Sequence, residues 1–185
     1  AVLDEEGLTG FLGLLWDSKT DEFGLRIPRY FVAKKVKGQI ENLEYFTGNT
    51  VAELKDFLNN EITLRKVLAR AMSYFDPTGC ISPFIARFRN LVRTSTIVAL
   101  SQWDTILPVE ILEEFCCLVI EAERIRDFRY PRSMHIANPK VRLYDLMCFS
   151  DAGEKGKTGV MYTYNDQIPS FAGGKTILPH RAHSI

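Results

Sequence analysis

The sequence has few histidines and cysteines, and its cysteines are not paired in any metal-binding pattern. Its 185 residues include three histidines and four cysteines, and the cysteines form no Cys-x-x-Cys pair. A zinc finger would therefore have no ligand set at its usual spacing. We expect reduced thiols, as in a cytoplasmic or nuclear protein, at all four positions: Cys80, Cys116, Cys117 and Cys148.

An excess of charge of one sign is also missing. The 23 Lys and Arg residues balance 23 Asp and Glu residues, so no global field attracts nucleic acid or an anionic membrane, and any such binding has to come from a local patch. No apolar run reaches the roughly 18 residues that a membrane-spanning helix needs. The acidic opening of residues 1–6 lacks the basic start of a secretory signal. These absences favour an intracellular protein without a membrane partner.

The sequence lacks the common signatures of several enzyme classes. It contains no glycine-rich phosphate loop, dinucleotide fingerprint or Ser/Cys-His constellation. The Asp-Thr/Ser-Gly signature of aspartic peptidases is also absent, because Asp76-Pro-Thr-Gly79 has an interposed proline and Asp151-Ala-Gly153 is only a distant variant.

The residues that are present predict an α+β chain, because 46% are apolar and 25% charged, which is typical of soluble globular proteins. In a β region at residues 1–49, the apolar runs Phe11–Trp16 and Phe23–Ile27 flank turn residues and predict a hairpin. We interpret residues 33–49, which are polar, as a loop with some strand.

A helical region is predicted over residues 50–126. Thr50 and Glu53 match a capping box, Pro83 stands at a favoured first helical position of a helix that runs to about Ser101, and a further helix begins near Pro108. A helix between the capping box and Pro83 ends at Asp76-Pro77, because proline disfavours helical geometry in the residue before it. Its apolar stripe consists of Leu64, Val67, Leu68, Ala71, Met72 and Phe75.

After a linker at residues 127–142, the pattern predicts a small antiparallel sheet over residues 143–185, with strands near 143–149, 159–164 and 170–178. Asp151 follows the first strand, before a polar loop to Thr158. A carboxylate at a strand end is typical of magnesium-dependent phosphodiesterases, but a turn aspartate is the simpler interpretation from spacing alone. Asp145 falls at the other end of that strand and Asp166 in a turn, so neither completes a metal pair.

Basic side chains are concentrated in the helical region, where residues 51–95 hold seven Lys or Arg against four Asp or Glu. Two interpretations stay open: a groove that follows a nucleic-acid backbone, or a solvated helix face held by salt bridges. The candidate contacts to a nucleic-acid backbone are Lys66, Arg70, Arg87, Arg89 and Arg93.

Several motifs together resemble the Pol polyprotein of BEL/Pao-type LTR retrotransposons over nearly the whole chain. The most specific is Phe75-Asp-Pro-Thr-Gly79 after a helix; the others include Leu12–Asp17, Trp103-Asp104, Leu107-Pro108 and Tyr130-Pro-Arg132. The resemblance implies the end of the reverse-transcriptase palm in residues 1–49 and a helical thumb and connection in 50–126. It implies a truncated ribonuclease H-like sheet in 143–185.

In that resemblance Asp151 corresponds to the first catalytic carboxylate of the ribonuclease H domain, a magnesium ligand. The other metal-binding acids would lie beyond this chain, so Mg²⁺ is implied for the parent enzyme, an RNA-directed DNA polymerase with ribonuclease H, and no cofactor for this chain alone. The implied role is a fragment of Pol that contacts the backbone of template-primer or an RNA/DNA hybrid without a complete active site. Its other partner would be the rest of the Pol polyprotein.

Two alternatives stay open at this point. A decayed or domesticated remnant could act as a protein-interaction module, and the exposed apolar face of a three-stranded sheet would suit that role. The region is also often labelled a Pao retrotransposon peptidase, although no peptidase signature supports that activity. We expect this chain alone not to be an enzyme.

Overall fold

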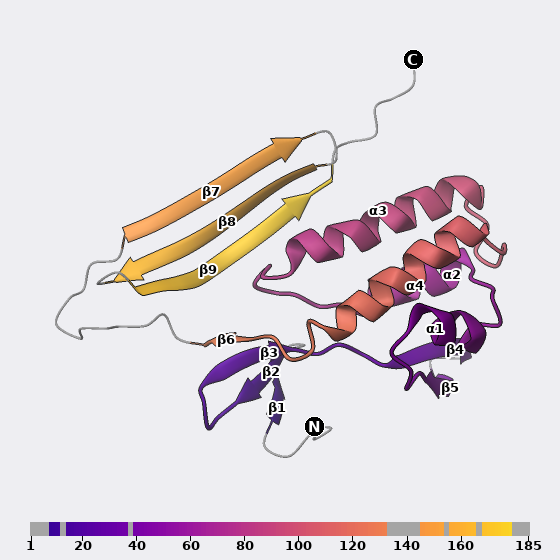
Figure 1. The fold of residues 1–185 in the computed structure, drawn as a ribbon, viewed down its shortest axis with the longest axis horizontal. Helices are drawn as coiled ribbons and strands as arrows, with labels where there is room; N and C mark the ends of the chain where they lie inside the picture. Colours follow the sequence, from indigo (N-terminus) through magenta and orange to yellow (C-terminus); the bar gives the residue numbers. More distant parts are fainter. Residues whose placement is uncertain are drawn as a thin grey trace. The chain divides into compact units, whose positions relative to one another are not determined.

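The computed structural model describes residues 8–11, 14–36, 39–132, 145–153, 156–165 and 168–178. Within them the chain is α+β, with helices and antiparallel sheets (Figure 1), which confirms the predicted class. The chain forms two compact units. Unit 1 comprises Ala1–Leu25, Asp76–Ala86 and Phe128–Ile185, and unit 2 comprises Arg26–Phe75 and Arg87–Asp127.

The first sheet of unit 1 contains the predicted N-terminal hairpin. Its order is β1-β2-β3-β6, and all neighbours are antiparallel. The fourth strand comes from the segment predicted as a linker, where Tyr130 pairs with Phe23 and their rings lie 5.9 Å apart. The strands are β1 (Leu8–Phe11), β2 (Leu14–Asp17), β3 (Glu22–Leu25) and β6 (Arg129–Pro131).

The second sheet of unit 1 is the predicted C-terminal antiparallel sheet, with longer strands than the pattern indicated. Strands β7 (Asp145–Gly153), β8 (Gly156–Asn165) and β9 (Ile168–Ile177) lie in that order (Figure 1). The pairing of β7 with β8 extends to Gly153 opposite Gly156. The prediction of a polar loop between Asp151 and Thr158 is therefore wrong, because most of that segment is paired in β7 and β8.

Unit 2 opens with a second hairpin, β4 (Tyr30–Val36) paired with β5 (Gln39–Tyr45). The interpretation of residues 33–49 as a loop with some strand missed this hairpin. The reason is that the stabilising partner of each strand is the other strand, so the polar sequence alone gives only a weak local signal.

The predicted helices are all present: α1 (Val51–Phe57), α2 (Leu64–Ala71), α3 (Ser82–Val98) and α4 (Val109–Glu123). The capping box of α1 is confirmed, since Thr50 and Glu53 satisfy each other's backbone donors. Helix α3 begins in unit 1 and continues in unit 2. In unit 2, Phe88 of α3 and Phe115 of α4 are fully buried, with ring centroids 6.5 Å apart. No helix in the described segments is long and apolar enough to cross a membrane.

Helix α2 ends earlier than its apolar stripe predicts. A tight turn follows Ala71, in which the backbone N–H of Ser73 donates to the carbonyl oxygen of Arg70 at 3.0 Å. Met72 and Phe75 are consequently 76% and 54% exposed. The predicted apolar stripe therefore does not extend to Met72 and Phe75, because the helix ends at Ala71.

Candidate functional site

Asp151 lies on β7 of the three-stranded sheet, opposite Thr158 of β8, which in turn pairs with Thr176 of β9. Paired residues of neighbouring strands project to the same face, so these three side chains share one face of the sheet. The hydroxyl oxygens of Thr158 and Thr176 are 2.9 Å apart, and that of Ser82 at the start of α3 is 3.1 Å from Thr176 Oγ1. A row of hydrogen-bonded hydroxyls therefore leads across this face toward the position of Asp151.

Asp151 itself is exposed and stands two residues before the end of β7, within the strand. Its Oδ1 accepts a hydrogen bond from the backbone N–H of Ala152 at 2.9 Å. Asp145 is the first residue of the strand, as predicted. The predicted turn residue Asp166 lies outside the described residues.

The donors around Asp151 are one carboxylate and neutral hydroxyls. Two-metal phosphodiester cleavage needs several carboxylates that converge on the ions, and nowhere in the described ranges do three His, Cys, Asp or Glu side chains gather. These residues alone do not fit such a centre.

The turn Asp76–Ile81 joins the start of α3 to the same sheet. The carboxylate of Asp76 accepts backbone N–H hydrogen bonds from Gly79 at 2.8 Å, from Cys80 at 3.0 Å and from Ile81 at 2.8 Å. The backbone N–H of Gly174 in β9 donates to the carbonyl oxygen of Thr78 at 3.0 Å. This turn contains most of the Phe-Asp-Pro-Thr-Gly motif, and its packing on β9, which is distant in the sequence, leaves no local signal in the motif itself.

Glycine is required at the centre of this turn for two reasons. Gly79 has a φ of 78°, which side-chain-bearing residues rarely adopt. A Cβ atom there would also lie 1.7 Å from the carbonyl oxygen of Gly174. The turn can approach β9 this closely only because neither residue has a side chain.

Burial raises the pKa values of two groups in or next to this turn, the thiol of Cys80 and the hydroxyl of Tyr130. It raises the pKa of the Cys80 thiol to about 12, and the negative charge of Asp76 acts in the same direction. Burial also raises the pKa of Tyr130, whose hydroxyl is 3.1 Å from Thr78 Oγ1. Neither group is therefore ionised at neutral pH, so neither is a ready nucleophile or base.

The structure places the five predicted basic residues in different surroundings. Arg70 is only 4% exposed, and its guanidinium carbon lies 4.9 Å from the ring centroid of Phe31 and 5.2 Å from that of Tyr74. Arg70 is therefore not at the surface, because its charge lies against aromatic rings inside unit 2. The apolar periodicity of α2 gave no signal of this.

The remaining four lie on the outer parts of α2 and α3. Arg87 forms an ion pair with Glu121 of α4 at 2.6 Å. The Arg93 side chain is half-buried and is not without an interaction partner. Arg89 is exposed and Lys66 half-buried. Neither of these two side chains takes part in an ion pair within the described part of the chain.

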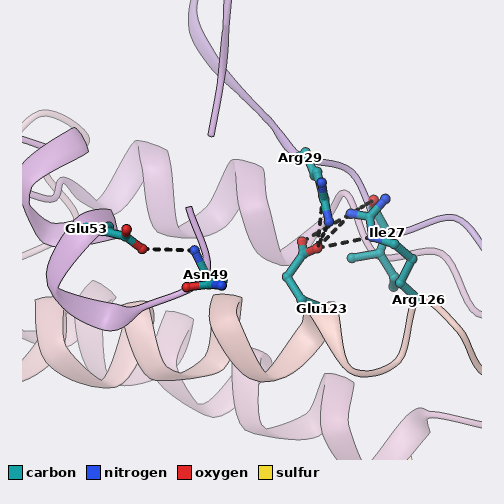
Figure 2. Close-up of polar contacts among 6 residues, drawn as sticks. All are labelled: Ile27, Arg29, Asn49, Glu53, Glu123 and Arg126. Carbon is teal, nitrogen blue, oxygen red and sulfur yellow. Dashed lines mark hydrogen bonds and ion pairs between the residues drawn. The ribbon is translucent and has the colours of Figure 1, made fainter. Parts of the chain in front are cut away.

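Acidic side chains of α4 form ion pairs with several other basic residues of unit 2. Glu123 accepts hydrogen bonds from Arg29 Nε at 3.0 Å and from Arg126 Nε at 3.1 Å, and Arg126 also donates to the carbonyl oxygen of Ile27 (Figure 2). Glu113 pairs with Lys55 at 2.6 Å. Figure 2 also shows Asn49, whose backbone N–H donates to Glu53. The hydrogen bond from the Thr50 side chain, and after it that from the Asn49 backbone, lowers the pKa of the Glu53 carboxyl.

Within the described residues, helices and an antiparallel three-stranded sheet give an α+β architecture, which is consistent with a truncated ribonuclease H-like sheet. A family model described as the Pao retrotransposon-like RNaseH-like domain matches residues 63–172, more than half of the sequence. The chain belongs to this family, which confirms the resemblance to the Pol region of BEL/Pao retrotransposons. No curated protein and no solved structure matches it.

Proposed function

We propose that the chain is a part of a retrotransposon Pol polyprotein that binds the backbone of an RNA/DNA hybrid or template-primer. The observation that carries this proposal is the charge of α2 and α3. These two helices contain no acidic residue. Their six bases are Arg65, Lys66, Arg70, Arg87, Arg89 and Arg93.

Lys66 and Arg89 are the first candidates for phosphate contacts, because they have no ion pair among the described residues. Arg87 can join them, since its side chain and that of Glu121 are 52% and 43% exposed. Such exposed pairs contribute about 0–1 kcal/mol, so a phosphate group can take the place of Glu121. Arg93 remains a candidate, whereas the buried Arg70 does not.

Binding of a fluorescent RNA/DNA hybrid, followed by anisotropy between 50 and 200 mM salt, tests this proposal. Each lost phosphate contact lowers the slope of log K against log salt by about 0.9. We expect Lys66→Gln with Arg89→Gln to lower the slope by about two. The control Lys19→Gln with Arg124→Gln removes the same charge from exposed positions elsewhere. An absence of binding by the unaltered chain at low salt would refute the proposal.

We further propose that Asp151 is the first carboxylate of a nuclease site that further acids complete in the parent polyprotein. Its position on the leading strand of a ribonuclease H-like sheet supports this role. We expect the chain alone not to cleave a hybrid with Mg²⁺, and a longer Pol polyprotein to lose cleavage on Asp151→Asn while hybrid affinity is kept. An Asp151→Asn polyprotein that cleaves at the unaltered rate would contradict it.

One observation favours protein interaction as a second candidate function. All nine residues of β7 are exposed, and within the described residues this edge strand pairs only with β8. An exposed edge is a template for a further strand, and the chemically natural partner is another segment of the same polyprotein. Hydrogen exchange tests this: the outward N–H groups of β7 should exchange quickly in this chain and slowly in a longer polyprotein.

A further inference from the structure

The face of the β7-β8-β9 sheet opposite Asp151 carries two lysines. Side chains alternate between the two faces along each strand, and the register groups one set across the three strands. We call this set the lysine face: Ser150, Ala152, Lys157, Gly159, Lys175 and Ile177.

The lysine face borders an open hollow of about 490 Å³. Asp151 and Thr158, which belong to the other face by register, complete its lining. Gly159 lies between Ser150 and Lys175 in the register, and a Cβ atom built on it would meet only the carbonyl oxygen of Phe149 at 3.7 Å. The centre of the face is therefore free of bulky side chains, and a ligand can come close to the backbone.

The two lysines are exposed, and no ion pair involves either of them within the described part of the chain. Lys157 pairs with Ile177 and Lys175 with Gly159, so the lysines are diagonal neighbours, whose Cα atoms lie roughly 7–8 Å apart in such a ladder. Both ammonium groups can thus point into one hollow. This arrangement contrasts with unit 2, where Glu113, Glu121 and Glu123 neutralise nearby bases.

We infer that the lysine face binds phosphate groups of a nucleic-acid strand that runs across the sheet. The inference rests on the proposed function and adds a second contact surface, in unit 1, to the one on α2 and α3. A polymer fits better than a free anion for two reasons. The hollow is open rather than enclosing, and the N–H groups of the central strand β8 are largely used in the ladders to β7 and β9, so flexible lysines supply the charge.

The hybrid-binding measurement on the full chain tests the inference with Lys157→Gln and Lys175→Gln together. We expect the slope of log K against log salt to fall by about two. The charge-matched control Lys19→Gln with Arg124→Gln should leave it unchanged. If the lysine-face variant keeps the full slope while Lys66→Gln with Arg89→Gln lowers it, the inference is wrong and the proposed function stands. If the unaltered chain binds nothing, both are wrong.

Two further measurements use the unaltered chain and therefore do not depend on a variant that folds. In the unaltered chain, Lys157 and Lys175 should be protected from an amine-acylating reagent when hybrid is bound, whereas Lys19 should not; equal labelling with and without hybrid would overturn the inference. Inorganic phosphate should displace the hybrid no better than chloride at equal ionic strength. Stronger displacement by phosphate would overturn the assignment to a polymer backbone.

Discussion

At the scale of single residues, burial separates the four cysteines into two pairs. Cys80 and Cys116 are partly or fully buried, and burial raises the pKa of each thiol to about 12. Cys117 and Cys148 are exposed. Because the thiolate is the reactive form, burial and the raised pKa both protect Cys80 and Cys116 from alkylation.

We therefore expect iodoacetamide at pH 8 to label Cys117 and Cys148 rapidly, and Cys80 and Cys116 only after unfolding, as followed by mass spectrometry. The raised pKa values have a second consequence. Above about pH 9 the unfolded chain releases thiol protons that the folded chain keeps, so stability falls as the pH rises from there toward 12. Rapid labelling of Cys80 in the native protein would contradict this account.

Residue-level reasoning from sequence failed most clearly at Arg70. A charged residue on a helix is expected to be solvated, whereas the guanidinium of Arg70 lies against the rings of Phe31 and Tyr74. Phe31 belongs to a hairpin 39 positions earlier in the sequence, and a contact of that separation leaves no mark on the local pattern. The ion-pair partner of Arg87, Glu121, likewise comes from another element of the fold, α4.

At the scale of elements, the turn Asp76–Ile81 depends on one carboxylate. Asp76→Ala leaves the backbone N–H groups of Gly79, Cys80 and Ile81 without their acceptor. Loss of a charged cap of this kind costs about 2 kcal/mol. We expect that loss in the free energy of unfolding by urea.

Two comparisons make this prediction specific. Asp76→Asn keeps an oxygen that can accept from Gly79 and Cys80, so it should cost about half as much. Asp56→Ala, at an exposed position of α1, should cost less than about 0.5 kcal/mol. Equal stability of the Asp76→Ala and Asp56→Ala variants would show that the turn does not need the carboxylate.

The elements themselves were largely predictable, because strong periodicity and capping chemistry are local. Thr50 and Glu53 marked the start of α1, and the apolar run after residue 143 marked β7. The missed elements depend on pairing with other strands: β4 and β5 stabilise each other, and β6 forms a strand by pairing with β3. For the same reason Asp151 was expected at a strand end, whereas its pairing with Thr158 keeps it inside the strand.

At the scale of the whole molecule, the balance of 23 basic and 23 acidic residues predicts weak mutual repulsion between chains at neutral pH. Net charge near zero favours association. We expect the solubility, measured by precipitation with polyethylene glycol from pH 5 to 9, to pass through a minimum near pH 7. A solubility that changes in one direction across this range would contradict the prediction.

The exposed strand β7 has a practical consequence for any study of Asp151. Asp145 and Asp151 are the only charged residues in this strand, and they stand on either side of the apolar segment Leu146–Phe149. Flanking charges of this kind act as gatekeepers that oppose aggregation through strand stacking. An Asp151→Asn substitution removes one gatekeeper together with the candidate ligand, so light scattering of that variant is needed before a loss of activity is attributed to chemistry.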